Sequence, residues 1–298
     1  MERKLKDYAL LTLKGMCMGA ADVVPGVSGG TIAFIVGIYD ELIDSIKGIN
    51  VHAFRLLCKG QLKAFWKAIN GNFLFSLLLG IGISVFSLAK LITYLLETEP
   101  VLVWSFFFGL VLASTWFVSK DIKEWNWKTI LGFLAGAVVA FYITVATPTE
   151  TPTNLLFIFF CGAIAICAMI LPGISGSFIL VLLGKYFYIM EAVETLDLVV
   201  LGIFALGCFL GITSFSHVLS YALKKFRNVT LAVLSGFMLG SLNKVWPWKE
   251  KIEEMVEGQN LIVEQNVLPG ESLAEGVVLM LIGFILVYVL EKISARKA

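Results

Sequence analysis

The sequence predicts an all-α polytopic membrane protein with two inverted-topology repeats, each a re-entrant broken-helix hairpin followed by three transmembrane helices. Three observations predict it: an apolar composition, six apolar stretches of spanning length, and a Pro-Gly-x-Ser-Gly motif that occurs twice. Of the 298 residues, 58% are hydrophobic and 15% are charged, with a mean hydropathy of +0.89, whereas soluble domains are about one quarter charged. Lipid is therefore the expected solvent for most of the chain.

The composition also excludes several classes of function. The net charge is +1, and Lys and Arg residues form short clusters between apolar runs, so no nucleic-acid surface is indicated. The five cysteines include no Cys-x-x-Cys pair, and there are only two histidines, which makes a metal cluster or a disulfide framework improbable. We expect no metal ligands, no cofactor and no nucleic-acid partner.

Six apolar stretches are long enough for a transmembrane helix, which needs about 20 residues to cross roughly 30 Å of hydrocarbon. They are residues 73–96, 101–118, 129–147, 198–223, 229–245 and 273–292. Two further stretches, 8–46 and 155–190, are interrupted by PGVSGG and PGISGS. Because proline removes a backbone donor and glycine frees the chain, each of these two is predicted to be a re-entrant hairpin.

The charges of the loops indicate on which side of the membrane each loop lies, because short cytoplasmic loops collect Lys and Arg. Basic residues cluster at both termini and in 47–67, 120–128 and 224–227, while 97–100, 148–154, 185–197 and the external loop 246–272 are poorer in them. Six spans and two hairpins that return to their own side place every basic segment inside, with cytoplasmic N- and C-termini. Hairpins that crossed fully as two short spans would give the same sides, so charge leaves that alternative open.

The segment 48–70 between the first hairpin and the first span has a composition of its own. Phe54, Leu57, Phe65 and Trp66 stand among basic residues, a pattern typical of an interfacial amphipathic helix. We expect it to anchor the chain at the inner membrane surface.

Two halves of the chain resemble each other, and such internal similarity defines architecture before any single motif does. PGVSGGTIAFIVGIY (25–39) matches PGISGSFILVLLGKY (172–186), and GISVFS and GLVLAS match GITSFS and GFMLGS in the same order. The predicted repeats are residues 1–150 and 151–298. Since each repeat contains three spans, an odd number, the second must be inserted upside down, as in many secondary transporters.

The two motifs predict a site for an anion. A helix that begins after each motif would direct unpaired backbone N–H groups and the positive end of its dipole to one point, which suits phosphate. Hydroxyl groups add donors, and glycines let a ligand approach the backbone. The candidate binding residues are Gly26, Ser28, Gly29, Gly30, Thr31, Gly173, Ser175, Gly176 and Ser177. The alternative is that small residues merely allow close helix packing, but two copies in inverted positions favour a ligand site.

Three ionisable residues inside apolar stretches are further candidates, because charge in lipid is costly without a partner. Asp22 could carry a proton or pair with a cation, or could instead cap a helix. Lys14 could neutralise a phosphate, or could extend to the membrane surface. His217 could relay a proton, although a hydrogen bond to a neighbouring helix is the commoner role for such a residue.

The segments GAADVVPGVSGGTIAFIVGIYDELI (19–43) and LPGISGSFILVLLGKY (171–186) resemble the paired signatures of the bacterial PopT family of polyprenyl-phosphate transporters. The resemblance covers nearly the whole chain. It implies the bacterial cytoplasmic membrane, undecaprenyl phosphate as the substrate returned from the outer to the inner leaflet, and 25–31 and 172–177 as the motif positions. Membrane lipids are the other expected partners, and a homo-oligomer remains open.

Two other functions could use motifs of this kind. Membrane-embedded polyprenyl-pyrophosphate phosphatases are similar in having inverted repeats and a Pro-Gly-x-Ser turn, but an arginine follows the serine in that family. Here Gly29 and Gly176 hold that position, and no catalytic residues with evident spacing replace the arginine. We therefore expect no enzyme activity. A transporter or channel for a small anion could use the same helix ends, and the sequence does not exclude it.

Overall fold

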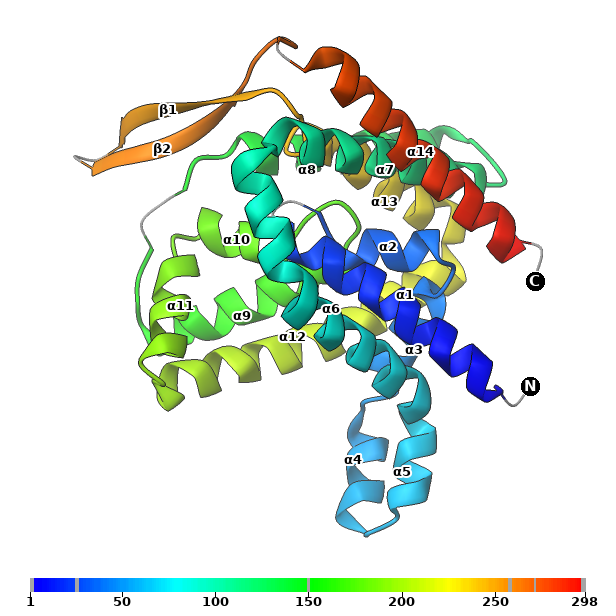
Figure 1. Cartoon of the computed structure of the whole chain (residues 1–298). Helices are drawn as coiled ribbons and strands as arrows, with labels where there is room; N and C mark the ends of the chain where they lie inside the picture. The colour runs from blue at the N-terminus through cyan, green and yellow to red at the C-terminus, as the bar shows by residue number, and fades with distance from the viewer. Residues whose placement is uncertain (1–2, 25–26, 149–150, 257–258, 271, 296–298) are drawn as a thin grey trace.

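In the computed structural model, residues 3–24, 27–148, 151–256, 259–270 and 272–295 are described. Helices make up most of the molecule, and one β-hairpin projects from it (Figure 1). The first half contains α1 (Leu5–Val23), α2 (Gly29–Ile35), α3 (Tyr39–Lys47), α4 (Val51–Cys58), α5 (Leu62–Ala68), α6 (Gly71–Thr98), α7 (Pro100–Lys120) and α8 (Trp127–Val145). The second half contains α9 (Leu155–Ile170), α10 (Gly176–Leu182), α11 (Tyr186–Glu194), α12 (Leu198–Lys225), α13 (Arg227–Ser241), β1 (Lys249–Val256), β2 (Gln259–Asn266) and α14 (Leu273–Ala295).

Five helices within the described residues are long and apolar enough to cross a membrane, namely α6, α7, α8, α12 and α14. They confirm an all-α polytopic membrane protein. Residues that favour helix starts stand at the beginning of three of them. Asn126 and Asp197 cap α8 and α12 through their side-chain oxygens, and Pro100 is the first residue of α7, as expected at these positions.

The sixth predicted span, 229–245, is wrong in length. The helix there, α13, has 15 residues and ends at Ser241, short of the about 20 that a crossing needs. Polar contacts explain the early end: Asn243 donates from Nδ2 to Thr144 Oγ1 at 2.9 Å, and Asn266 donates to the Asn243 carbonyl at 2.9 Å. The chain turns at Asn243 toward β1 instead of continuing as a helix.

Each of the two interrupted stretches folds as one longer helix and two short ones. In the first, α1 is followed by α2 and α3; in the second, α9 is followed by α10 and α11, which meet at 109°. Gly37 and Gly184, which align in the repeat, separate the short helices with φ of 68° and 61°. Only glycine adopts this left-handed conformation without strain, so both glycines are needed for the sharp bends.

Two connecting segments differ from their predictions. The segment 48–70 forms two short helices, α4 and α5, rather than one, because Gly60 between them has a φ of 70° and ends α4. The segment 246–272, predicted as a loop, contains the antiparallel pair β1 and β2, in which Lys249 pairs with Asn266. This β-hairpin is the projection at the upper left of Figure 1.

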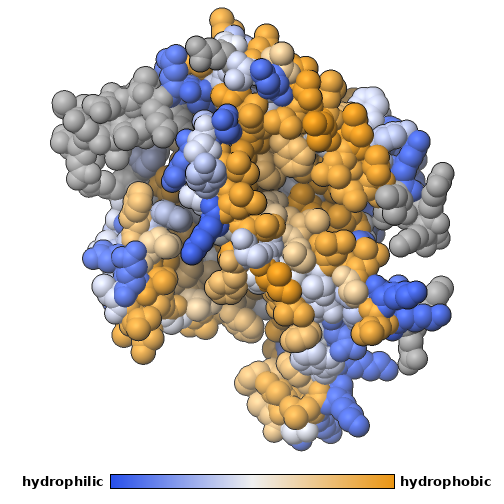
Figure 2. All heavy atoms as spheres, viewed as in Figure 1, coloured by the Kyte–Doolittle hydropathy of each residue, from blue (hydrophilic) through white to orange (hydrophobic). Residues whose placement is uncertain are grey.

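Helices at equivalent positions of the two halves have equivalent packing partners. Helix α1 packs along α6, and α9 packs along α12; across the two halves, α7 packs on α14 and α8 on α13. Glycines allow the backbones to approach closely, as is common between helices in membranes. Figure 2 shows apolar residues spread over the outside of these helices, as a lipid-facing surface requires.

Replacing Gly109 with Val should destabilise the α7–α14 pair. A Cβ at Gly109 would overlap the Met280 carbonyl oxygen, whereas a Cβ at Gly82 of α6 would meet nothing within 4 Å. Overpacking of this kind costs about 1–3 kcal/mol. Thermal unfolding in detergent should show a lower midpoint for Gly109→Val and little change for Gly82→Val, and equal midpoints would contradict the close packing.

Candidate functional site

The two broken turns meet, and the first holds the second. Ser28 donates to the Met169 carbonyl at 2.8 Å, the Gly173 N–H donates to Thr31 Oγ1 at 3.0 Å, and Tyr39 donates to the Ile170 carbonyl at 3.2 Å. Ser28 and Thr31 are completely buried. The hydroxyl groups predicted to bind phosphate in the first turn therefore hold the backbone of the second half.

The backbone donors at the start of α2 are also occupied. The Gly29 N–H donates to Asp22 Oδ1 at 2.7 Å, and the Gly30 N–H donates to Ser28 Oγ at 3.0 Å. A Cβ at Gly29 would fall 2.6 Å from Asp22 Oδ2, and one at Gly30 would overlap the Ile170 carbonyl oxygen. Both glycines are thus required by the packing of this turn, while Pro25 and Gly26 of the motif lie outside the described residues.

Asp22 and Lys14 hold opposite ends of α2. Asp22 accepts from the first residue of the helix, and Lys14 Nζ donates to the carbonyl of Val36, the C-cap residue, at 2.6 Å. A negative group at the N-terminus and a positive group at the C-terminus both complement the helix dipole. The internal alignment places Cys161 and Met169 where Lys14 and Asp22 stand, so α10 lacks this clamp.

The second turn is the more accessible of the two. Ser175 caps α10 by accepting from the Phe178 N–H at 3.3 Å, and its Oγ lies 3.3 Å from that of Ser177. Gly176 and Ser177 are half-buried, in contrast to the buried residues of the first turn. Gly173, with a φ of 94°, rests against α13, where a Cβ would fall 2.7 Å from Ser241 Oγ.

Lys244 lies near the second turn and was not predicted from the sequence as a site residue. Its Nζ lies 4.8 Å from the centre of the Phe178 ring, which follows Ser177 in the first turn of α10. A cation over an aromatic face is attracted to it, so the lysine is held against a side chain of the first turn of α10. The sequence could have indicated this lysine, because it lies within the predicted span 229–245 and a lysine inside a span needs a partner or a polar cavity.

His217 is not joined to either turn by its hydrogen bond. It is exposed on α12, and its Nδ1 lies 2.7 Å from the Thr213 carbonyl oxygen, one turn earlier on the same helix. Lys185, by contrast, is buried at 4% exposure and donates to the Thr151 carbonyl at 2.6 Å. This lysine was not among the functional residues predicted from the sequence.

The three ion pairs found among the described residues all hold α3. Arg3 pairs with Glu41 at 2.5 Å, Lys224 with Asp44 at 2.8 Å, and Arg227 with Asp40 at 3.0 Å. Two of them join α3 to the end of α12 and the start of α13. We call this part of the molecule the basic end; it also includes the backbone of Lys123, which donates to Asn228 Oδ1.

Hydrogen bonds keep two of these carboxylates ionised. Partial burial would raise the pKa of Asp44, but hydrogen bonds from Lys224 and Ser220 outweigh it, and the pKa is lowered. The pKa of Glu41 is lowered in the same way by Arg3 and Asn70. A lowered pKa means that the contact is present above the ordinary pKa near 4 and is lost only as pH falls below it. We therefore expect the contact of α3 with α12 to be insensitive to pH between about 5 and 8. The rate at which a thiol reagent labels cysteines introduced at the basic end, measured across this pH range, would test this.

At the opposite end the equivalent helix is packed differently. Helix α3 packs on α12, but among the described residues α11 packs on α10 and α12 without a comparable contact on α6. Glu191, which aligns with Asp44, makes no ion pair with any of the described residues. Among the described residues the two halves therefore share a plan but differ in packing: α3 of the first half packs on the second half, whereas α11 of the second half makes no comparable contact with the first.

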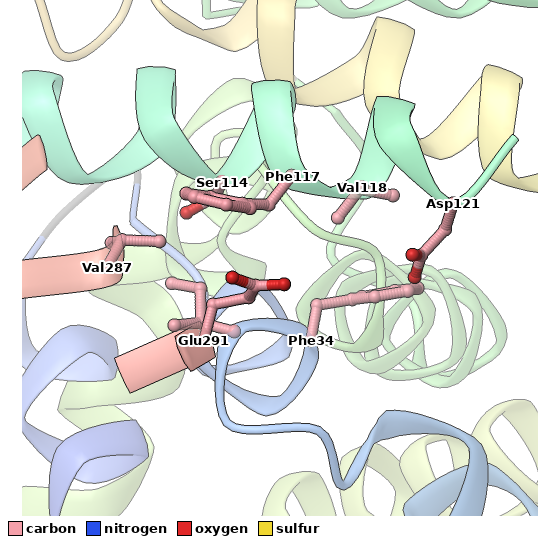
Figure 3. Close-up of a pocket in the computed structure, with 8 residues that line it drawn as sticks. Phe34, Ser114, Phe117, Val118, Asp121, Val287 and Glu291 are labelled. Carbon is pink, nitrogen blue, oxygen red and sulfur yellow. The ribbon is translucent and has the colours of Figure 1, made fainter. Parts of the chain in front are cut away.

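A separate pocket lies between α2, α7 and α14 (Figure 3). Its cavity volume is about 70 Å³, and it is lined by Phe34, Ile35, Ser114, Phe117, Val118, Asp121, Val287 and Glu291. Figure 3 shows the Glu291 carboxylate directed into this space. Two carboxylates and no basic side chain make it a poor place for an anion, so we do not assign phosphate to it.

Within the described residues, no group of three or more His, Cys, Asp or Glu side chains is placed to hold a metal ion. The features that define the class of protein are instead the apolar spans and the two broken helices that meet between them. Together they define a multi-pass membrane protein with a polar centre made of interrupted helices, the construction used for solute sites in transporters.

Comparison with known proteins identifies the family. A sequence model described as VCA0040-like, undecaprenyl phosphate translocase-like, matches residues 18–263, and the chain belongs to this family. A polyprenyl-phosphate transporter of Vibrio cholerae serotype O1 is 48% identical over 274 residues, which cover 91% of this chain and 89% of the relative. A polyprenyl-phosphate transporter of Staphylococcus aureus is 34% identical over 256 residues, covering 79% and 85%. No solved structure matches the chain.

The family and both relatives are named for transport. The chain is accordingly a transporter and not an enzyme. The family predicted from the two Pro-Gly-x-Ser-Gly motifs is confirmed, and the phosphatase alternative is set aside.

Proposed function

We propose that this protein moves undecaprenyl phosphate from the outer to the inner leaflet of the bacterial cytoplasmic membrane, with both termini in the cytoplasm. The names of the family and of the two relatives support a polyprenyl phosphate as the substrate. A phosphate monoester needs only a small polar cradle, and its hydrocarbon chain can stay in lipid while the headgroup crosses.

The phosphate is expected to bind first at the second turn. Ser177 and the backbone of Gly176 are half-buried, whereas Ser28 and Thr31 are buried against the second half. Lys244, held over Phe178 at the start of the same helix, is the nearby positive charge that we expect to attract the phosphate to this turn. Hydrogen bonds to a charged phosphate are stronger than those between neutral groups and contribute about 1.5–3 kcal/mol each.

Alternating access between inverted repeats is the mechanism that we infer, and the unequal packing of the two hairpins is the observation that carries it. The basic end is closed by α3 on α12, and the part of the opposite end that the structure describes shows no equivalent packing of α11 on α6. If the repeats are related by inversion, exchanging their two conformations would open the basic end and close the other. The two ion pairs that join α3 to α12 and α13 are exposed and so contribute only about 0–1 kcal/mol each, which suits a contact that must break in every cycle.

Transport by purified protein in liposomes tests the proposed site. The double variant Ser175→Ala with Ser177→Ala removes two hydrogen-bond donors to the phosphate. Because about 1.4 kcal/mol corresponds to a factor of ten, the rate of undecaprenyl phosphate translocation should fall by at least about tenfold. Ser87→Ala is the matched control, because Ser87 is exposed on α6 and donates to the Ile83 carbonyl of its own helix.

The same liposomes separate the substrate from a small anion. Undecaprenyl phosphate should be translocated while inorganic phosphate is not released from the vesicles. Release of inorganic phosphate without lipid translocation would overturn the proposal in favour of a small-anion transporter, and an unchanged rate in the double serine variant would remove the second turn from the site.

A further inference from the structure

Helices α4 and α5 form an arm that projects from the bundle (Figure 1). Helix α4 packs on α5, and α5 also packs on α6. The base of the arm is fastened where Trp66 Nε1 donates to Asn72 Oδ1 at 2.7 Å. The arm is therefore an ordered element held at a fixed place beside the start of α6, and its sides are available for contacts outside the chain.

Each helix of the arm carries an exposed apolar stripe. On α4, Val51, Phe54 and Leu57 are 67%, 63% and 40% exposed, and on α5, Leu62 and Trp66 are 63% and 43% exposed. Spacings of three and four residues place these side chains on one side of each helix. Exposed apolar side chains gathered in this way mark a contact surface rather than chance exposure.

Basic residues form a second stripe on each helix. His52, Arg55 and Lys59 follow one another at helical spacing on and just after α4, and Lys63 and Lys67 do so on α5; all are exposed. The segment 48–70 contains no Asp or Glu. Figure 2 shows the projection as apolar atoms with hydrophilic atoms gathered along one side, so the two kinds of residue are segregated.

We propose that the arm lies in the surface of the leaflet at the basic end, with its apolar stripes in the acyl region and its basic stripes on anionic phospholipid headgroups. Segregated apolar and basic stripes are the pattern of helices that lie in a membrane interface, and uncompensated positive charge is complementary to an anionic lipid surface. The position agrees, because the arm joins α3, which lies at the basic end, to α6, whose first residues begin a span.

The arm is also attached to α3, the helix that closes the basic end. Helix α3, which pairs with Lys224 and Arg227, ends at Lys47, and α4 begins at Val51. Asn70, at the other end of the arm, donates to Glu41 Oε1 at 2.9 Å and to Ser45 Oγ at 3.1 Å. Both ends of the arm are thus attached to α3, so a bilayer that holds the arm also fixes the position of α3.

Nitroxide accessibility in the full-length protein tests this placement. The five native cysteines are replaced, and single cysteines are introduced as Phe54→Cys on an apolar stripe and Lys63→Cys on a basic stripe. In vesicles of phosphatidylglycerol and phosphatidylcholine, the label at 54 should be reached severalfold better by oxygen than by a water-soluble nickel chelate, and the label at 63 should show the opposite preference.

A second measurement tests the choice of lipid. The quadruple variant Arg55→Gln, Lys59→Gln, Lys63→Gln and Lys67→Gln should lose most of the enrichment of phosphatidylglycerol around the protein, while Lys128→Gln, an exposed lysine stacked on Trp127, should not. Equal access of both reagents to position 54 would overturn the proposal and leave the surface for a soluble partner. Spin–spin broadening at 54 that disappears on dilution with unlabelled protein would also overturn it, in favour of a second copy of the chain.

Discussion

Bridging α3 to α12 should stop transport completely. Asp44 on α3 accepts a hydrogen bond from Ser220 on α12 at 2.8 Å, so cysteines at these two positions can be joined by a short bis-methanethiosulfonate reagent, which attaches to each thiol through a disulfide bond. In a chain without the native cysteines, the bridged Asp44→Cys, Ser220→Cys protein should show translocation at background level. Cleavage of the bridge by a reductant should restore it, because the proposed cycle requires the basic end to open.

The matched control is a bridge that constrains only one element. Cysteines introduced as Asp40→Cys and Asp44→Cys lie one turn apart on α3, so the same reagent joins the helix to itself. This variant loses two ion pairs yet should transport with or without the reagent. Undiminished transport by the bridged 44–220 protein would contradict alternating access at this contact.

Removing the clamp on α2 should have the second largest effect. Lys14→Met leaves the Val36 carbonyl without its lysine donor, and Asp22→Ala leaves the Gly29 N–H without its acceptor. An unsatisfied buried group costs about 1–3 kcal/mol, more when a charged partner is lost. Thermal unfolding in detergent should show a lower midpoint for each variant, and translocation should fall because α2 carries Thr31 and is preceded by Ser28, both of which hold the second turn.

Asp22→Asn distinguishes the clamp from a proton-carrying role. Asparagine retains an oxygen that can accept from the Gly29 N–H, so this variant should be more stable than Asp22→Ala and should keep most of its transport. Loss of transport by Asp22→Asn at the stability of the unmodified protein would contradict the clamp and assign the carboxylate to coupling.

Much of the fold could be predicted because hydrophobic length and helix-breaking residues are local properties. The five long spans follow from apolar runs alone, and glycines at 37 and 184 that align in the repeat mark bends that other residues would strain. The early end of α13 could not be predicted, since it depends on contacts of Asn243 with residues distant in sequence. The β-hairpin at 249–266 was missed because a polar loop and a polar two-stranded ribbon have similar compositions.

The residues of the candidate site could be predicted from the sequence, but their contacts could not. The sequence indicated that Ser28, Thr31 and their counterparts belong together, but not that the first turn would hold the second through Met169 and Gly173. Nor could the sequence show that Asp22 accepts the hydrogen bond of the Gly29 N–H at the start of α2. These contacts cross between the halves, and an alignment of the halves with each other contains no information on how they dock.

The central claim is tested most directly by the amount of undecaprenyl phosphate exposed on the outer face of bacterial cells that depend on this protein for its recycling. Depletion of the protein should raise the outer-leaflet pool, and the unmodified chain should restore it, whereas the chain with both Ser175→Ala and Ser177→Ala should not. An outer-leaflet pool that is the same with and without the protein would contradict the proposed transport.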